Sequence, residues 1–209
     1  MTAGRLSHVI RSLPMLRALT ITGVVLLFAC GGEKGGEQSV YELSRDPVSV
    51  RGWITDVKDA KHQQNIDMEL ARRTEMFANS SVWVEKTQYA SGGIAGNGAF
   101  IVLDVPPQTA TIGFNAPGAE NAQLVMLNVP SSADVFIPDI VLEPGGAKVL
   151  DPKKMQVRLP AEVSAPRPTG KMATIAGHQV PIVETPLAQM TNRREYPDPG
   201  GFRPLATVK

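Results

Sequence analysis

The sequence predicts a mainly β fold, an antiparallel β-sandwich of about seven strands. From residue 46 to residue 144, short runs alternate apolar and polar residues, which is the period of a strand with one buried face. Turn residues separate these runs at short intervals, in a chain with 19 glycines and 17 prolines among its 209 residues. Hydrophobic residues make up 43% of the chain, which is enough to form a packed core and argues against wholesale disorder.

Turn-forming residues mark where the expected strands begin and end. Asn97 and Gly98 tolerate positive φ and precede a hairpin strand, and a pair of prolines at 106–107 ends that strand. Gly52 lies on the apolar face of the first strand, where we expect a bulge or a close contact. Pro138 indicates an edge or a bulge in the last strand, because proline has no N–H to donate. The strands are expected at 47–57, 80–86, 99–105, 109–114, 122–129 and 134–142.

Residues 62–78 have a different period and predict a short helical insertion between the first two strands. Ile66, Leu70 and Phe77 fall roughly on one stripe of a helix. Asn65 is placed to cap its N-terminus, since asparagine side chains accept hydrogen bonds from the first backbone N–H groups.

The first 30 residues carry the pattern of an export signal. Three arginines precede an apolar run at 18–29, which is too short to span a bilayer and fits the apolar core of a signal peptide. The run ends in Leu-Phe-Ala-Cys, and Cys30 is the only cysteine of the chain. This ending resembles the lipobox of bacterial lipoprotein signal peptides, with Phe28 in a slot that usually holds a smaller residue.

The lipobox resemblance implies a signal peptide at 1–29 and a lipid on Cys30, which becomes the first residue of the mature chain. Residues 30–45 are then a flexible tether, because they begin with a Gly-rich polar run. The implied location is the bacterial cell envelope, lipid-anchored and facing the periplasm or the surface. It is the outer membrane if the organism has one, since Gly31 is not the Asp that retains lipoproteins at the inner membrane in enteric bacteria. The alternatives are an uncleaved signal anchor, an ordinary secreted protein, and a cytosolic protein in which this pattern is not an export signal.

The charge balance argues against a nucleic-acid partner. The formal net charge is +1 at pH 7, whereas nucleic-acid binders usually carry a basic excess on one face. The run VRGWITDV resembles the first strand of OB-folds, but aromatic residues make up only 5% of the chain, too few for a base-stacking platform.

The strand pattern between residues 46 and 144 is similar to carboxypeptidase regulatory-like domains, which are transthyretin-like Greek-key sandwiches. The matching positions are Val50, Gly52, Ile54, Val82, Val84, Gly98, Phe100, Val105 and Pro106. Gln108 stands where the family usually has glycine, and Ala110 where it usually has tyrosine. The resemblance implies a non-catalytic Greek-key sandwich domain at 46–144, because its motif consists of packing and turn positions.

Residues 145–209 predict a Pro-rich extension, since ten of the 17 prolines lie between Pro144 and Lys209. We expect one extra strand within 149–159 and a small hairpin at 172–184, turning at 176–178. For the tail two interpretations are open. It lies on the surface or is disordered, or it is a docking strap that lies on a partner, since proline makes such segments stiff.

No motif in the sequence predicts catalysis, a cofactor or a metal site. His62 and His178 are the histidines downstream of the export signal, and neither belongs to a metal-binding spacing. Ser91 lacks the glycine two residues earlier that a nucleophile elbow requires. We expect four acidic residues to be solvated turn residues rather than calcium ligands or a carboxylate pair; these are Asp56, Asp59, Asp134 and Asp139.

Trp53 and Trp83 are the candidate binding surface. Both lie opposite the valine face of their expected strands. They either pack against the inserted helix or a second sheet, or form an exposed pair that stacks on a sugar or anchors a partner.

We therefore expect a non-enzymatic, lipid-anchored binding or scaffolding module with an envelope-protein or cell-wall partner. A module that binds glycan or another cell-wall ligand is the alternative, and it requires Trp53 and Trp83 to be exposed and adjacent. A small hydrolase is a third hypothesis, and it requires a cleft that gathers distant His, Asp and Ser residues.

Overall fold

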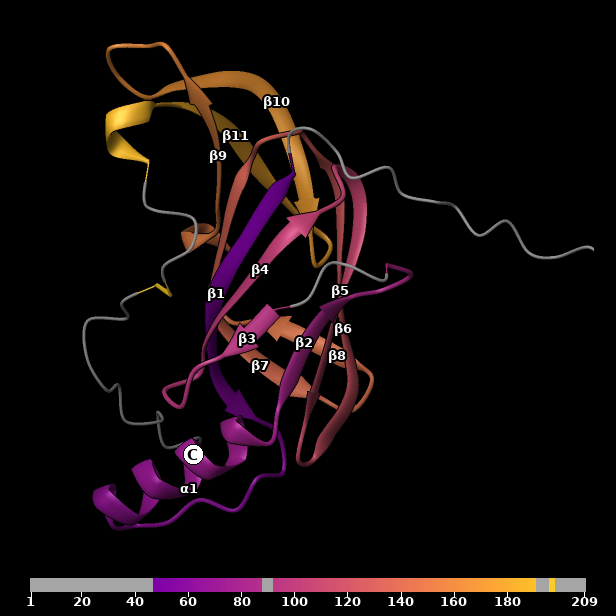
Figure 1. Cartoon of the computed structure of the whole chain (residues 1–209), viewed down its shortest axis with the longest axis vertical. Coiled ribbons are helices and arrows are strands. Elements are labelled where there is room, and N and C mark those ends of the chain that lie inside the picture. The colour runs from indigo at the N-terminus through magenta and orange to yellow at the C-terminus, as the bar shows by residue number, and fades with distance from the viewer. Residues whose placement is uncertain (1–46, 88–91, 191–195, 198–209) are drawn as a thin grey trace, which may run out of the picture. The chain divides into compact units, whose positions relative to one another are not determined.

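The computed structural model describes residues 47–87, 92–190 and 196–197. Within these ranges the chain is mainly β with one α-helix, as the sequence predicts (Figure 1). The helix α1 spans Ile66–Ala78, and two 3-10 turns, η1 and η2, span Pro152–Lys154 and Leu187–Gln189. The strands are β1 (Val48–Val57), β2 (Ser81–Val84), β3 (Gly92–Ile94), β4 (Ala99–Val105), β5 (Gln108–Ala116), β6 (Ala119–Val129), β7 (Asp134–Glu143), β8 (Gly146–Val149), β9 (Gln156–Ala161), β10 (Arg167–Ile175) and β11 (His178–Pro186).

The eleven strands form one mixed sheet. Its order is β2-β5-β6-β10-β11-β9-β7-β1-β4-β3, and β8 pairs with β7 beside this path. β1 pairs with β7 in parallel and β11 pairs with β9 in parallel, while the other neighbours are antiparallel. The mainly β class is thus confirmed, and the antiparallel Greek-key sandwich of about seven strands is not. Parallel neighbours need a long crossover between them, and here the chain forms α1 and five further strands between β1 and β7.

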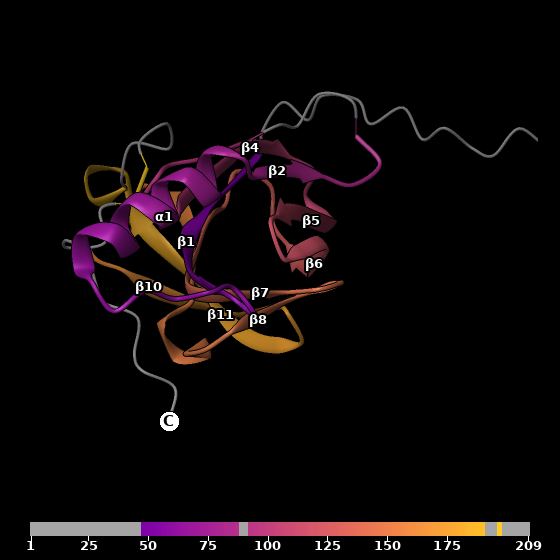
Figure 2. The ribbon, with the colours of Figure 1, turned by 90° about the horizontal axis from the view of Figure 1, so that it is seen from below.

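The sheet curls until its two ends meet. β2 and β3, the terminal strands, lie next to each other, and Figure 2 shows the strands arranged around a common centre. Gly92 permits this approach, because an added Cβ would lie 2.8 Å from the Val82 Cγ1 atom. Inward side chains fill the centre, where the rings of Phe100 and Phe114 meet edge to face with centroids 5.2 Å apart. The sheet is therefore nearly closed around a solid core.

The helix begins where the sequence predicts. The Asn65 side chain accepts hydrogen bonds from the backbone N–H groups of Asp67 and Met68, which makes it the N-cap. Two acidic residues in the first turn, Asp67 and Glu69, complement the helix dipole.

The buried face of α1 differs in part from the predicted stripe. Phe77 is buried as expected, but Ile66 and Leu70 are 64% and 42% exposed. The residues that α1 buries are Glu69, Arg73, Met76 and Phe77. Two of them are charged, and pairing with neighbouring groups is what makes their burial possible. A hydrophobicity pattern does not identify such a face.

Strands β8 to β11, which lie beyond the boundary expected at residue 144, belong to the same sheet. β9 pairs with β7 and β11, and β10 pairs with β6 and β11. β10 and β11 form the expected hairpin, which turns at Ala176 and Gly177, both with positive φ. Val157, Ala173 and Ile182 are buried in the core.

Gly52 makes the close contact expected from the sequence. An added Cβ would overlap the Ile137 carbonyl oxygen on β7 and would lie 2.6 Å from Cε1 of Phe100 on β4. The β1–β7 register shifts directly after Gly52, opposite Pro138 and Asp139, so the bulge expected at Pro138 is also present. Glycine lets β1 pack between β4 and β7 at this point.

Replacing Gly52 by alanine is expected to lower the free energy of unfolding by about 3 kcal/mol, because the overlap with a backbone oxygen requires a strand to move. Urea unfolding followed by tryptophan fluorescence measures this change. Gly146→Ala is the matched control, since Gly146 also lies in a strand and nothing lies within 4 Å of an added Cβ. Similar losses in the two variants would contradict the steric argument.

Candidate functional site

Strands β5, β6, β10 and β11 present a row of uncharged side chains on the outside of the sheet. In register across these strands, Thr109 lies opposite Leu127, Leu127 opposite Thr174, and Thr174 opposite Gln179. The Gln179 amide donates a hydrogen bond of 2.9 Å to the Thr174 hydroxyl. The row crosses four neighbouring strands without an ionisable group.

Aliphatic side chains are exposed in and beside this row. Val125 is 44% exposed, Leu127 39% and Met172 43%. We call the outward side chains of this region the uncharged face: Thr109, Thr111, Gln123, Val125, Leu127, Met172, Thr174, Gln179 and Pro181. Large aliphatic groups that share one sheet face favour contact with another surface, although single exposed ones are common.

Sequence reasoning did not find the uncharged face. β6 carries aliphatic side chains on both faces, so that Leu124 and Met126 are buried while Val125 and Leu127 are exposed. An apolar run of this kind indicates a strand buried on both sides. The threonines of β5, on the side opposite Ala110 and Ile112, were the available signal that the second side is not buried.

Trp83 lies at the border of the uncharged face. Its indole lies on Gly113 of β5, where an added Cβ would lie 2.7 Å from the Trp83 Nε1 atom. The Nε1–H group donates a hydrogen bond of 3.1 Å to Glu85 Oε1. The ring is half-buried, and its contact with Gly113 holds β2 against β5.

Trp53 lies on another part of the outer surface. Its Nε1–H group donates a hydrogen bond of 2.7 Å to the Asn97 carbonyl oxygen, in the turn before β4. Across the closure of the sheet, where β2 meets β3, the strands β4 and β3 lie between β1, which carries Trp53, and β2, which carries Trp83. Both indoles are half-buried outside the core, and the structure places them on strands that are not neighbours. Cys30, the expected lipidation site, lies outside the described residues.

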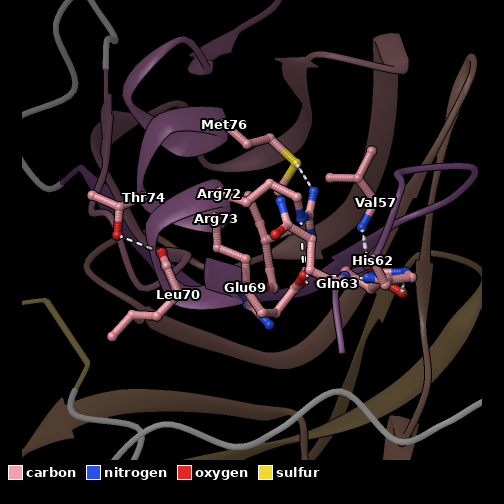
Figure 3. A network of polar contacts seen from close by, with 11 residues as sticks. Val57, His62, Gln63, Glu69, Leu70, Arg72, Arg73, Thr74 and Met76 are labelled. Carbon is pink, nitrogen blue, oxygen red and sulfur yellow. Dashed lines mark hydrogen bonds and ion pairs between the residues drawn. The ribbon is translucent and has the colours of Figure 1, made fainter. Parts of the chain in front are cut away.

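A polar network fastens the start of α1 to the chain before it (Figure 3). Glu69 Oε1 accepts a hydrogen bond of 2.6 Å from Arg72 Nη2, and Glu69 Oε2 accepts one of 2.9 Å from the Gln63 backbone N–H. The His62 ring lies between two carboxylates, with Nδ1 3.4 Å from Glu69 Oε1 and Nε2 3.5 Å from Asp56 Oδ2. The network therefore joins β1, the loop that follows it and α1.

The charges of this network stabilise one another. The hydrogen bond from Arg72 lowers the pKa of Glu69 to about 2, against the opposing effect of burial. Next to it, Arg73 is 3% exposed; it donates a hydrogen bond to the Ile54 carbonyl oxygen and lies over the Phe77 ring. Burial lowers the pKa of the Arg73 guanidinium, and the carboxylates of Asp56 and Glu69 oppose that shift. Each of these contacts helps to hold α1 in place against the rest of the chain.

A second buried cluster centres on Asp134 at the start of β7. Its carboxylate accepts hydrogen bonds from Arg51 Nε at 3.1 Å and Nη2 at 2.8 Å, from Arg158 Nη2 at 2.8 Å, and from the Ser49 hydroxyl at 3.1 Å. Asp134 is 0% exposed and Arg51 is 2% exposed. The expectation that Asp134 is a solvated turn residue is wrong, because its partners come from β1 and β9, 83 and 24 residues away.

Of the other three acidic residues only Asp59 fits the expectation, because Asp56 and Asp139 lie in β1 and β7 and are partly buried. Asp139, in the β7 bulge, contacts Lys154 Nζ at 3.3 Å and accepts a hydrogen bond from the Thr55 hydroxyl. Asp59 is exposed in a turn with a φ of 63°, as expected for a solvated turn residue. Among the described residues, no group of three or more His, Cys, Asp or Glu side chains could hold a metal ion.

The two histidines lie on different elements. His62 lies in the loop before α1, and His178 is exposed at the start of β11. In the part of the chain that the structure describes, no helix is long and apolar enough to cross a membrane.

Neither a scan against protein-family models nor a search of the curated proteins found a match to this chain.

Replacing Asp134 by asparagine is expected to lower the free energy of unfolding by about 3–5 kcal/mol, because it leaves the buried Arg51 charge uncompensated. Glu143→Gln removes a surface carboxylate 3.8 Å from Lys58 and should change stability by less than about 0.5 kcal/mol. Denaturant titration measures both changes. A small loss for Asp134→Asn would contradict the assigned role of this cluster.

Glu69→Gln is expected to cost about 1–3 kcal/mol of stability at neutral pH, since it removes an acceptor of charge-assisted hydrogen bonds. The folded-state pKa of Glu69 is lowered, so its contribution is complete above the ordinary value of 4.5 and is lost as pH falls towards 2. The difference between wild type and variant should therefore shrink over that range. Glu75→Gln, at an exposed position of the same helix, is the control. A stability difference between wild type and Glu69→Gln that does not vary with pH would contradict the lowered pKa of Glu69.

Proposed function

We propose that the protein is a lipid-anchored, non-catalytic binding or scaffolding module of the bacterial cell envelope. The observation that carries the binding role is the uncharged face, with Val125, Leu127 and Met172 exposed on neighbouring strands. The centre of the sheet is filled with side chains, so a partner would bind at its outer surface. The polar clusters at Glu69 and Asp134 are occupied by partners within the chain, which supports a structural role for them.

The anchor is proposed from the sequence. Cys30 ends an apolar run at 18–29 and is followed by Gly-rich polar residues, which suit a flexible spacer between a membrane and a folded domain. Attachment through a lipid on Cys30 would place the domain at the membrane surface. We propose the outer membrane as its location if the organism has one.

We also propose a relationship to carboxypeptidase regulatory-like domains. Gln108 has a φ of 70°, in the left-handed region that favours glycine, at a position where that family usually has glycine. Gly52 and Phe100, two further positions of the shared pattern, are paired neighbours on β1 and β4. The family's antiparallel Greek-key arrangement stays a prediction for this chain.

Binding of a cell-wall glycan is the second candidate. Trp53 and Trp83 do not form the exposed, adjacent pair expected for it, because both are half-buried and lie on strands that are not neighbours, so the candidate rests on Trp83 at the border of the uncharged face. Indole rings stack on sugars, and threonine and glutamine side chains supply hydrogen bonds to hydroxyl groups. Retention of the protein on isolated cell-wall material, reduced in Trp83→Phe more than in Trp53→Phe, would support this candidate over a protein partner.

Cys30→Ala is expected to abolish incorporation of labelled fatty acid and to release the protein from the membrane fraction, because the proposed lipid attaches to this thiol. Fractionation of envelopes and labelling in growing cells measure the two effects. Ser39→Ala, in the same tether, is the control and should stay lipidated and membrane-bound. Membrane retention of Cys30→Ala would contradict the anchor, and the localisation would then rest on an uncleaved signal segment.

A further inference from the structure

We propose that the uncharged face is the contact between two copies of this chain. The row formed by Thr109, Leu127, Thr174 and Gln179 runs in direct register across four strands. It presents aliphatic, hydroxyl and amide groups, all neutral at any physiological pH. This inference deepens the proposed binding role, since it names the partner.

The absence of charge on this face favours a second copy as the occupant. In a twofold contact the same patch lies on both partners, so a side chain near the axis approaches its own copy. A charged side chain there would meet a like charge, which is destabilising. A partner that is charged at its contact would find no complementary group among the nine side chains of the uncharged face.

The backbone arrangement suits packing of one sheet against another. Two sheets pack face to face about 10 Å apart when outward side chains interdigitate, as in β-sandwiches. Val125 and Leu127 point outward from β6, and the smaller Thr109, Thr111 and Thr174 flank them on β5 and β10. Larger groups beside smaller ones provide ridges and hollows that a second copy can match.

The size of the face sets the expected strength of the contact. Nine side chains are fewer than the about 20–30 residues per partner of a standard stable interface. We therefore expect a weak dimer in dilute solution and a populated dimer on a membrane, because anchoring raises the effective concentration of the second copy. In this respect the inference rests on the proposed function.

Disulfide crosslinking of the full chain in native envelopes tests the contact. Leu127→Cys places a thiol at the centre of the uncharged face, and Leu70→Cys places one at a leucine of similar exposure on α1, outside that face. We expect about tenfold more disulfide-linked homodimer from Leu127→Cys under mild oxidation, since only that thiol would be held near its own copy. Equal yields, or a crosslink to a different protein, would overturn the proposal.

The wild-type chain reports separately on the anchor. A lipidated Cys30 has no thiol and gives no disulfide, whereas a free Cys30 gives a dimer in wild type. If that occurs, the proposed anchor has failed, and the Leu127→Cys and Leu70→Cys yields are compared again in a Cys30→Ser background at high protein concentration. The ratio of the two disulfide yields then tests the contact between copies independently of the anchor.

A charge-swap experiment guards against misfolding of a single variant. Leu127→Glu and Leu127→Lys should each lose association with a differently tagged copy of themselves, because like charges meet at the centre of the contact. Co-expression of the two variants should restore co-precipitation towards the wild-type level. Loss without restoration, with both variants folded by circular dichroism, would show that the face does not meet its own copy.

Discussion

The ion cluster at Asp134 is the interaction on which the rest of the sheet depends. One carboxylate at the start of β7 binds Ser49 and Arg51 of β1 on one side and Arg158 of β9 on the other. It lies where the parallel β1–β7 pair adjoins the antiparallel β7–β9 pair. Buried charges are stable only when paired, so displacing one of these strands while the others stay packed would leave a charge in the interior without its partner. The cluster therefore couples the first described strand to the C-terminal ones.

Two further constraints complete the nearly closed sheet. Gly52 lets β1 approach β7 and Phe100 more closely than any other residue allows, which brings the parallel pair into register. At the end of β1, the Glu69–Arg72 pair and the buried Arg73 seat α1 over the core. With the inside filled and both polar clusters satisfied, the outer surface is what the molecule offers to a partner. On β5, β6, β10 and β11 that surface includes the uncharged face.

Local features of the fold could be predicted from the sequence, and long-range ones could not. The N-cap at Asn65, the bulge at Pro138 and the turn at Gly177 each depend on a few neighbouring residues. The parallel pairing of β1 with β7 and the burial of Asp134 depend on partners more than 80 residues apart, which no periodicity encodes. The uncharged face was missed for a different reason. Both sides of β6 carry apolar residues, so the sequence of this strand alone does not show which side faces solvent. The strands that pair with β6 decide this.

Native-state amide hydrogen exchange shows whether the Asp134 cluster makes β1, β7, β9 and β11 one cooperative unit. We expect the slowest amides of all four strands to exchange with the same opening free energy, equal to that of global unfolding. This expectation would be contradicted if the amides of β9 and β11 opened together at a free energy about 2 kcal/mol or more below those of β1 and β7. The C-terminal strands would then be a separable layer, and the buried carboxylate would not couple them to the rest of the sheet.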